Sequence, residues 1–318
     1  MLFDNDGGEL AEALARLKSP EAAARRVAIL ELADLGDDLA VPQIIAALSD
    51  ADAEVREAAA RALTTFEGKE VAVALLIALE DQAPNVRQAA ADALAERRRP
   101  EASGVLIAHI SHAAPFVRAA ALRALVELRA PAALEQALGA LHDADASVRQ
   151  TAVTLLGWLR DPKSVEGLIE ATRDADAGVR QAAIGALAIE GAGGAAQAAL
   201  IAGLRDSHWR VREAAAQGFG KLKLRDGVAA LITAMADDYW QVRVKAAEAL
   251  GQLKDPRAIP VLATTLDHPI SNLRKEATAA LGEIGHPDAR APLLKHVDDP
   301  DPDVRKLNRW ALTRIASE

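Results

Sequence analysis

The chain has 318 residues, no cysteine, and a formal net charge of −9 from 37 basic and 46 acidic side chains. Without cysteine there can be no disulfide framework, thiolate metal site or cysteine nucleophile, and the negative charge does not favour nucleic acid as a partner. No long uncharged apolar stretch and no basic leader followed by an apolar run is present, so we expect a cytoplasmic chain that does not insert into a membrane.

From the N-terminus, residues 1–8 (MLFDNDGG) are predicted to be a disordered lead, and residues 9–318 a single repetitive domain. Arginine recurs through this domain in steps of 31 residues, with one step of 32 between Arg180 and Arg212. A period of this length indicates a stack of small supersecondary units. We call these ten residues the ladder arginines: Arg25, Arg56, Arg87, Arg118, Arg149, Arg180, Arg212, Arg243, Arg274 and Arg305.

Each period contains two segments with helical character. An apolar residue lies seven positions after every ladder arginine, and it shares a helical face with the apolar residue that usually precedes the arginine. A shorter apolar stretch comes before it, such as 41–48, which begins near Pro42 and ends at an acidic turn with Asp50. We therefore predict two helices per period, twenty in all, and no strands.

The acidic turn is expected to begin the second helix. Aspartate stands six residues before most ladder arginines, where its side chain can cap the helix and favour the positive end of the helix dipole. His112 and His268 stand at the corresponding position in two periods, and we expect them to replace aspartate as turn or cap residues.

The segment 237–256, DDYWQVRVKAAEALGQLKDP, shows the repeated pattern most fully. It resembles the HEAT-like repeats of the phycobilin-lyase type, and the resemblance covers about residues 9–316. This resemblance implies an all-α, right-handed, armadillo-like α-solenoid of about ten two-helix repeats, with the first helices on the convex side and the second helices on the concave side. It also implies that each ladder arginine reaches the acidic turn of its own or an adjacent repeat.

The predicted function is a scaffold, adaptor or assembly factor that binds another protein or a peptide on the concave face. One alternative is a bilin-lyase-like subunit that handles a tetrapyrrole and its acceptor protein, although a dense aromatic cluster for a tetrapyrrole is absent from the sequence. A lesser alternative is a consensus-derived artificial repeat protein. No His-Glu pair, HExxH, GxSxG or phosphate-binding loop occurs, so no catalytic residue, metal ligand or cofactor is predicted.

The first candidate binding site lies on the polar stripe formed one, five and nine positions after each ladder arginine. Trp158 is an outlier on this stripe and is predicted to anchor a partner together with Ile189, because exposed tryptophan often dominates interface energy. The expected polar rim comprises Glu127, Gln150, Thr154, Gln181 and Lys221. The other interpretation is that Trp158 folds over Leu128 or Leu187 of a neighbouring repeat and only fills space.

A second candidate consists of aromatic residues at matched positions of consecutive repeats, just before the second helix. His208 and Trp209 form one pair, and Tyr239 and Trp240 form the other. They are interpreted either as packing at the helix start or as an edge that recognises a partner.

Overall fold

The computed structural model describes residues 6–96, 98, 100–187 and 193–315. Two units divide the chain, residues 1–159 and residues 160–318. Within the described residues the chain is all helical, with twenty α-helices and no β-strand, which confirms the predicted all-α solenoid of two-helix repeats. None of the described helices combines the length and the apolar character that crossing a membrane requires. The single domain predicted for residues 9–318 stays a prediction. Of the predicted disordered lead, residues 1–5 lie outside the described residues, whereas residues 6–8 belong to the first helix, which begins at Asp6.

The first unit contains ten α-helices, and a 3₁₀ turn precedes or follows several of them. The α-helices are α1 (Asp6–Arg16), α2 (Ala22–Leu35), α3 (Val41–Ala47), α4 (Ala53–Ala62), α5 (Lys69–Ala78), α6 (Pro84–Ala95), α7 (Ser103–His109), α8 (Pro115–Leu128), α9 (Leu134–Ala140) and α10 (Ala146–Leu159). The 3₁₀ turns are η1 (Asp38–Ala40), η2 (Leu63–Thr65), η3 (Pro100–Ala102) and η4 (Pro131–Ala133).

The second unit repeats this alternation of a short first helix and a longer second helix. Its α-helices are α11 (Ser164–Ala171), α12 (Ala177–Leu187), α13 (Gly193–Gly203), α14 (Trp209–Leu222), α15 (Val228–Ala234), α16 (Trp240–Leu253), α17 (Ile259–Thr265), α18 (Ser271–Ile284), α19 (Arg290–Lys295) and α20 (Pro302–Ile315). Its 3₁₀ turns are η5 (Arg225–Gly227), η6 (Pro256–Ala258) and η7 (Pro287–Ala289).

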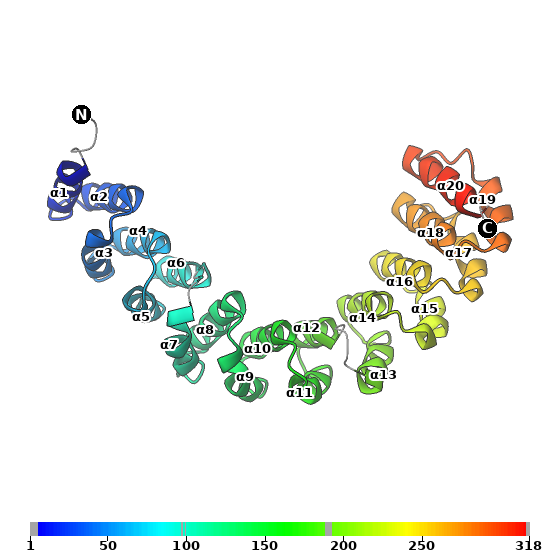
Figure 1. Cartoon of the computed structure of the whole chain (residues 1–318), viewed down its shortest axis with the longest axis horizontal. Helices are drawn as coiled ribbons and strands as arrows, with labels where there is room; N and C mark the ends of the chain where they lie inside the picture. Colours follow the sequence, from blue (N-terminus) through cyan, green and yellow to red (C-terminus); the bar gives the residue numbers. More distant parts are fainter. Residues whose placement is uncertain (1–5, 97, 99, 188–192, 316–318) are drawn as a thin grey trace. The chain divides into compact units, whose positions relative to one another are not determined.

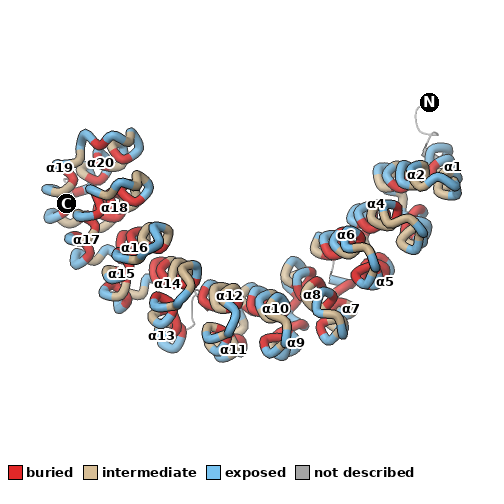
Figure 2. The backbone as a smooth tube through the Cα atoms, turned by 180° about the vertical axis from the view of Figure 1, so that it is seen from behind, coloured by how far each residue is buried: buried red, intermediate tan, exposed pale blue. Residues whose placement is uncertain are grey.

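Within each unit the helices form two layers (Figure 1). The even-numbered second helices lie side by side in one layer, and the odd-numbered first helices form the other. Buried residues concentrate between the layers and between neighbouring repeats (Figure 2), where alanine, valine and leucine side chains form the core. Small side chains allow the helices to approach closely, so each repeat is stabilised by its neighbours rather than by a central core.

The second helices begin at a turn that the sequence described only in part. The aspartate six residues before the ladder arginine is not the N-cap, contrary to our expectation; in α4 the N-cap is Asp52, whose carboxylate accepts from the backbone N–H groups of Glu54 and Val55. Asp50 instead accepts from the N–H of Asp52 at 2.9 Å. The earlier aspartate therefore shapes the turn and leaves the cap to the residue two positions later.

Most second helices end with a residue in the left-handed conformation, eleven positions after the ladder arginine. Glycine holds this position at Gly36 and Gly285, where φ is 63° and 72°. Basic residues hold it at Arg129, Arg160, Lys223 and Lys254, with φ between 46° and 53°. A positive φ is strained for a residue with a Cβ atom, and the cation offsets part of that strain by lying near the negative end of the helix dipole.

Glycine in the second unit also brings neighbouring second helices together. A Cβ atom on Gly251 of α16 would lie 2.8 Å from the Cα atom of Ala280 in α18, and one on Gly220 of α14 would lie 3.1 Å from the Cα atom of Ala249. These positions are eight residues after a ladder arginine. Larger side chains stand there in the first unit at Thr64 and Val126.

Candidate functional site

The ladder arginines link consecutive repeats. In at least six repeats the guanidinium binds, through Nε and Nη2, both oxygens of an aspartate in the turn of the following repeat, at 2.6 to 3.0 Å. The pairs are Arg25–Asp50, Arg56–Asp81, Arg118–Asp143, Arg180–Asp206, Arg212–Asp237 and Arg274–Asp299. Nη1 of the same arginines donates to two carbonyl oxygens of their own turn, for example those of Asp50 and Ala51 in the case of Arg56. The predicted reach of arginine to the acidic turns is confirmed for these six pairs.

These bidentate bonds also change the acidity of the aspartates. The hydrogen bonds from Arg25, Arg56 and Arg274 hold the pKa values of Asp50, Asp81 and Asp299 below the ordinary value, and partial burial opposes this effect. The carboxylates therefore stay ionised and paired at neutral pH. We assign the ladder to structure, since a feature that recurs in six repeats does not define one site.

His112 and His268 take the place of the ladder aspartate, and their predicted role in the turn is confirmed. Nδ1 of His112 accepts from the backbone N–H of Ala114, and Nδ1 of His268 accepts from that of Ile270, both at 3.1 Å. Each imidazole thus shapes its turn as the aspartate does in the other repeats.

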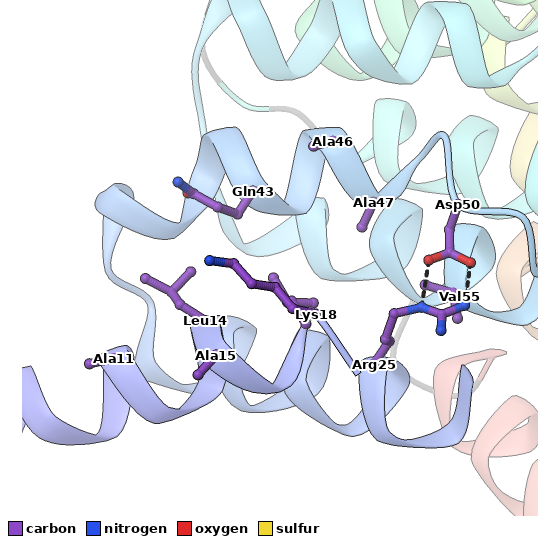
Figure 3. A pocket seen from close by; sticks show the side chains of 11 residues that line it. Ala11, Leu14, Ala15, Lys18, Arg25, Gln43, Ala46, Ala47, Asp50 and Val55 are labelled. Carbon is purple, nitrogen blue, oxygen red and sulfur yellow. Dashed lines mark hydrogen bonds and ion pairs between the residues drawn. The ribbon is translucent and has the colours of Figure 1, made fainter. Parts of the chain in front are cut away.

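Cavities lie between the first helices of neighbouring repeats, above the arginine–aspartate pairs. The largest of those described, about 620 Å³, is lined by α1, α3 and the Arg25–Asp50 pair. Figure 3 shows the side chains of Lys18 and Gln43 extending into the gap between these helices, with apolar side chains such as Leu14 beside them. Two similar cavities of about 410 and 430 Å³ adjoin Arg118–Asp143 and Arg180–Asp206. The sequence stripe, which considered only second helices, did not indicate them.

Trp158, in α10, is 50% exposed. The guanidinium of Arg129 lies over the indole ring, 5.0 Å from its centroid. Trp158 is therefore not folded into the core, and its contact with Arg129 is a cation–π interaction that leaves much of the ring available. Arg129 was not among the predicted site residues, although its position after α8 is one that basic residues repeatedly hold.

The predicted rim of Trp158 is only partly assembled within one unit. Glu127, Gln150 and Thr154 belong to the first unit and are exposed there. The hydroxyl of Thr154 donates to the carbonyl of Gln150 at 3.0 Å, and Glu127 lies 3.7 Å from a guanidinium nitrogen of Arg98.

Gln181 and Lys221 belong to the second unit, in α12 and α14, and Ile189 lies outside the described residues. The first candidate site thus remains a prediction as a whole.

The second candidate is assembled within the second unit and is called the aromatic edge: His208, Trp209, Tyr239 and Trp240. The rings of Trp209 and Tyr239 stack with centroids 5.5 Å apart, and the imidazole of His208 also stacks with Trp209, with centroids 6.3 Å apart. Tyr239 is 46% exposed and Trp240 is 37% exposed.

Two cations complete this surface. Arg210 lies over Trp209 and Arg212 over Tyr239, at 5.3 and 5.7 Å from the ring centroids. Trp209 also packs against the buried core of the unit, and Nδ1 of His208 accepts from the N–H of Arg210 as the N-cap of α14. Trp209 and His208 therefore take part in packing and capping at the helix start, while Tyr239 and Trp240 present aromatic surface to solvent. Recognition of a partner by these residues stays a prediction.

Comparison with known families identifies the repeat. A family model described as HEAT repeats matches residues 10–82, 72–146, 135–220, 197–270 and 228–313, which together span most of the chain. The chain belongs to the HEAT-repeat family. The phycobilin-lyase subtype is not shown by this match and stays a prediction. No curated protein matches the sequence.

Solved structures of similar fold include natural and engineered proteins. YibA of Escherichia coli is 21% identical with a TM-score of 0.66, over 85% of this chain and 98% of that one. An engineered protein is 21% identical with a TM-score of 0.54, over 97% and 99%. Kap95p, in a structure that describes its binding to RanGDP, is 16% identical with a TM-score of 0.66, over 96% of this chain and 50% of that one. At these identities the likeness concerns the fold alone.

Proposed function

We propose that the chain is a protein-interaction scaffold that binds a partner protein or peptide, and that the aromatic edge of the second unit is a principal contact surface. The observation that carries this proposal is the stack of Trp209 on Tyr239, beside the exposed ring of Trp240. Exposed aromatic rings held in place by neighbouring side chains bury a large area on binding and lose little conformational entropy. Arg210 and Arg212 hold the stacked rings in one arrangement.

The fold supports a scaffold because a row of parallel helices offers an extended surface with many points of attachment. Kap95p, a solenoid of similar fold, binds the protein RanGDP. The described residues also include no group of three or more histidine, cysteine, aspartate or glutamate side chains placed to hold a metal ion. Trp158 with Arg129 provides a second aromatic contact surface in the first unit, in keeping with the predicted groove site.

Affinity capture from the source cell tests the proposal. Wild-type chain is compared with the double variant Tyr239→Ala/Trp240→Ala and with Trp158→Ala, and the retained proteins are identified and their affinities measured. We expect the double variant to lose at least about 2 kcal/mol of binding free energy, as interface anchors do. Ile77→Ala, which removes an exposed apolar side chain from α5, is the control and should bind normally.

The possible outcomes distinguish the aromatic edge from the Trp158 surface, and a scaffold from a bilin-lyase-like subunit. Full binding by the double variant with loss in Trp158→Ala would move the contact surface to the first unit. Full binding by both variants would refute the proposed contact surfaces. Retention of a visible chromophore with the captured chain would favour the bilin-lyase-like alternative.

A further inference from the structure

Arg243 and His268 meet at a position where at least six other repeats hold an arginine–carboxylate pair. Nη1 of Arg243 lies 3.2 Å from Nε2 of His268, and both side chains are partly exposed. All residues of this contact lie in the second unit. The replacement of aspartate by histidine leaves the arginine facing a ring instead of two carboxylate oxygens.

The hydrogen-bond roles at this contact conflict. Nδ1 of His268 accepts from the backbone N–H of Ile270 at 3.1 Å. A neutral imidazole whose Nδ1 is an acceptor carries its proton on Nε2, so the N–H of His268 points at the N–H of Arg243. Protonation of the ring adds a second N–H and does not relieve the conflict. The pKa of His268 is lowered, first by burial and then by the charges of Arg243 and Arg274, which keeps the ring neutral at pH 7.

Arg243 also has N–H groups that donate to no acceptor among the described residues. Its Nε atom is buried and has no hydrogen-bond partner. The other nine ladder arginines donate from Nη1 to two carbonyl oxygens of their own turn. Within the described part of the chain, Arg243 has no such bonds, because its Nη1 is turned toward His268. A buried donor without an acceptor is rare in folded proteins, so this one indicates a missing partner.

The other histidine of the ladder has a carboxylate beside it. His112 has the same arrangement at Nδ1, and its Nε2 faces the carboxylate of Glu80 at 3.3 Å. Glu80 lies seven residues before Arg87, and the residue seven before Arg243 is Ala236. The chain therefore supplies a carboxylate to His112 but none to His268.

We propose that Arg243 and His268 form a binding site for a carboxylate that comes from outside the chain, either a small carboxylic acid or an acidic side chain of a partner. The site offers converging N–H donors with positive charge, which is the pattern that recognises carboxylates. The neighbouring carboxylates are already engaged, since Asp237 binds Arg212 and Asp267 binds Nε2 of His296 at 3.0 Å. Arg274 adds positive charge from α18. The proposal does not depend on the aromatic edge.

Titration of the whole chain with acetate, at constant ionic strength in chloride, tests the site through the imidazole ¹⁵N resonances. We expect a saturable shift of the His268 resonances, while those of His112, which already has Glu80, stay in place. Arg243→Gln should weaken the response at least tenfold. His268→Asp supplies the carboxylate internally, as in the other repeats, and should raise the melting temperature. This variant has no imidazole at the site, so the side-chain Nε resonance of Arg243 is followed instead; it should shift with acetate in the wild type and not in the variant.

A parallel titration with a tetraglutamate peptide separates the two sources of the carboxylate. Saturation by acetate and peptide alike supports a site open to small acids, and saturation by the peptide alone supports an acidic side chain of a partner. No saturable shift with either probe would overturn the proposal. An acetate-dependent shift of the Arg243 Nε resonance in His268→Asp as large as that in the wild type would overturn it as well.

Discussion

The guanidinium of Arg118 donates hydrogen bonds to both carboxylate oxygens of Asp143, twenty-five residues later in the chain, at 2.7 Å each. The same guanidinium donates through Nη1 to the carbonyls of His112 and Ala113 in its own turn, at 2.8 Å. One side chain therefore ties the turns of two consecutive repeats together. Since both partners are largely buried, the bond depends little on solvent screening.

Arg118→Ala should lower the free energy of unfolding by about 2 to 4 kcal/mol, because it leaves Asp143 largely buried without its partner. Urea unfolding followed by circular dichroism measures this loss. The control is Arg26→Ala, which removes an exposed ion pair with Glu54 between the same kinds of repeats and should cost less than about 1 kcal/mol. Equal losses of unfolding free energy in the two variants would show that the Arg118–Asp143 bond contributes no more to stability than an exposed ion pair.

Stability should fall steeply in acid. A carboxyl whose pKa is lower in the folded state stabilises the fold above its unfolded pKa, and this stabilisation is lost as the pH falls through the folded pKa. Asp50, Asp81 and Asp299 have lowered pKa values, owing first to their arginine hydrogen bonds. These three aspartates stay ionised between pH 7 and 5, so we expect them to change the urea midpoint little in that range. Below about pH 4 they take up protons, and the midpoint should decrease.

Arg56→Ala provides the control for the acid prediction. It removes the bond that lowers the pKa of Asp81, so the variant should lose less additional stability in acid than the wild type. If the urea midpoint falls equally steeply with decreasing pH in both proteins, acid destabilises the chain through the protonation of other groups.

The period of 31 residues was sufficient to predict the fold, because the repeats place a turn that is usually acidic, an arginine and an apolar helix in the same order. The exact turn geometry was not predictable in this way. Asp50 and Asp52 are both acceptable helix caps by residue type, and only the backbone shows that Asp52 caps α4 while Asp50 pairs with Arg25. A local pattern does not show which of two nearby acids faces the preceding repeat.

Gly251→Ala should destabilise the second unit. The added Cβ atom would lie 2.8 Å from the Cα atom of Ala280, and backbone cannot move aside as a flexible side chain can. We expect a loss of about 1 to 3 kcal/mol from overpacking, reduced by the better helix propensity of alanine.

Gly185→Ala in α12 is the matched control, because nothing lies within 4 Å of its added Cβ atom. It should stabilise the chain by about 0.5 to 1 kcal/mol. Differential scanning calorimetry measures the change in stability of both variants, and we expect the two changes to have opposite signs. A stabilising Gly251→Ala would contradict the close approach of α16 and α18.

Lys223→Gly should stabilise the chain by about 0.4 to 1 kcal/mol, because Lys223 has a φ of 52° and glycine adopts that conformation without strain. The reverse change, Gly285→Lys at the matched position with a φ of 72°, should destabilise it. Thermal unfolding of the two variants tests the pair. Two changes of the same sign would mean that the helix-end cations outweigh the backbone strain.

Trp158→Ala should leave stability within about 1 kcal/mol of the wild type, since half of the side chain is exposed and its contact with Arg129 is an exposed cation–π interaction. Leu156→Ala, two residues away and fully buried, should cost about 2 to 5 kcal/mol. A large loss in Trp158→Ala would instead support a role in packing.

The candidate site was predictable only in outline. The sequence marks Trp158 and Tyr239 as unusual because aromatic residues are rare here, and both are indeed exposed. It does not show that Arg129 covers one face of Trp158, since their contact depends on the left-handed end of α8. Nor does it show the conflict at His268, which arises from the direction of one backbone N–H group.

The arginine ladder has a consequence for rearranging the chain. Each bridge joins an arginine to an aspartate in the turn of the next repeat, whereas the residue at that position after Arg87 is His112. Excision of residues 88–118 would remove one full period with His112 and bring the turn of Asp143 next to Arg87. The Arg118–Asp143 bridge would be replaced by one between Arg87 and Asp143, so the shortened protein would have one repeat fewer and the same number of bridges. The repeats are therefore interchangeable parts, and their fit depends on the side chain that the next turn offers to each arginine.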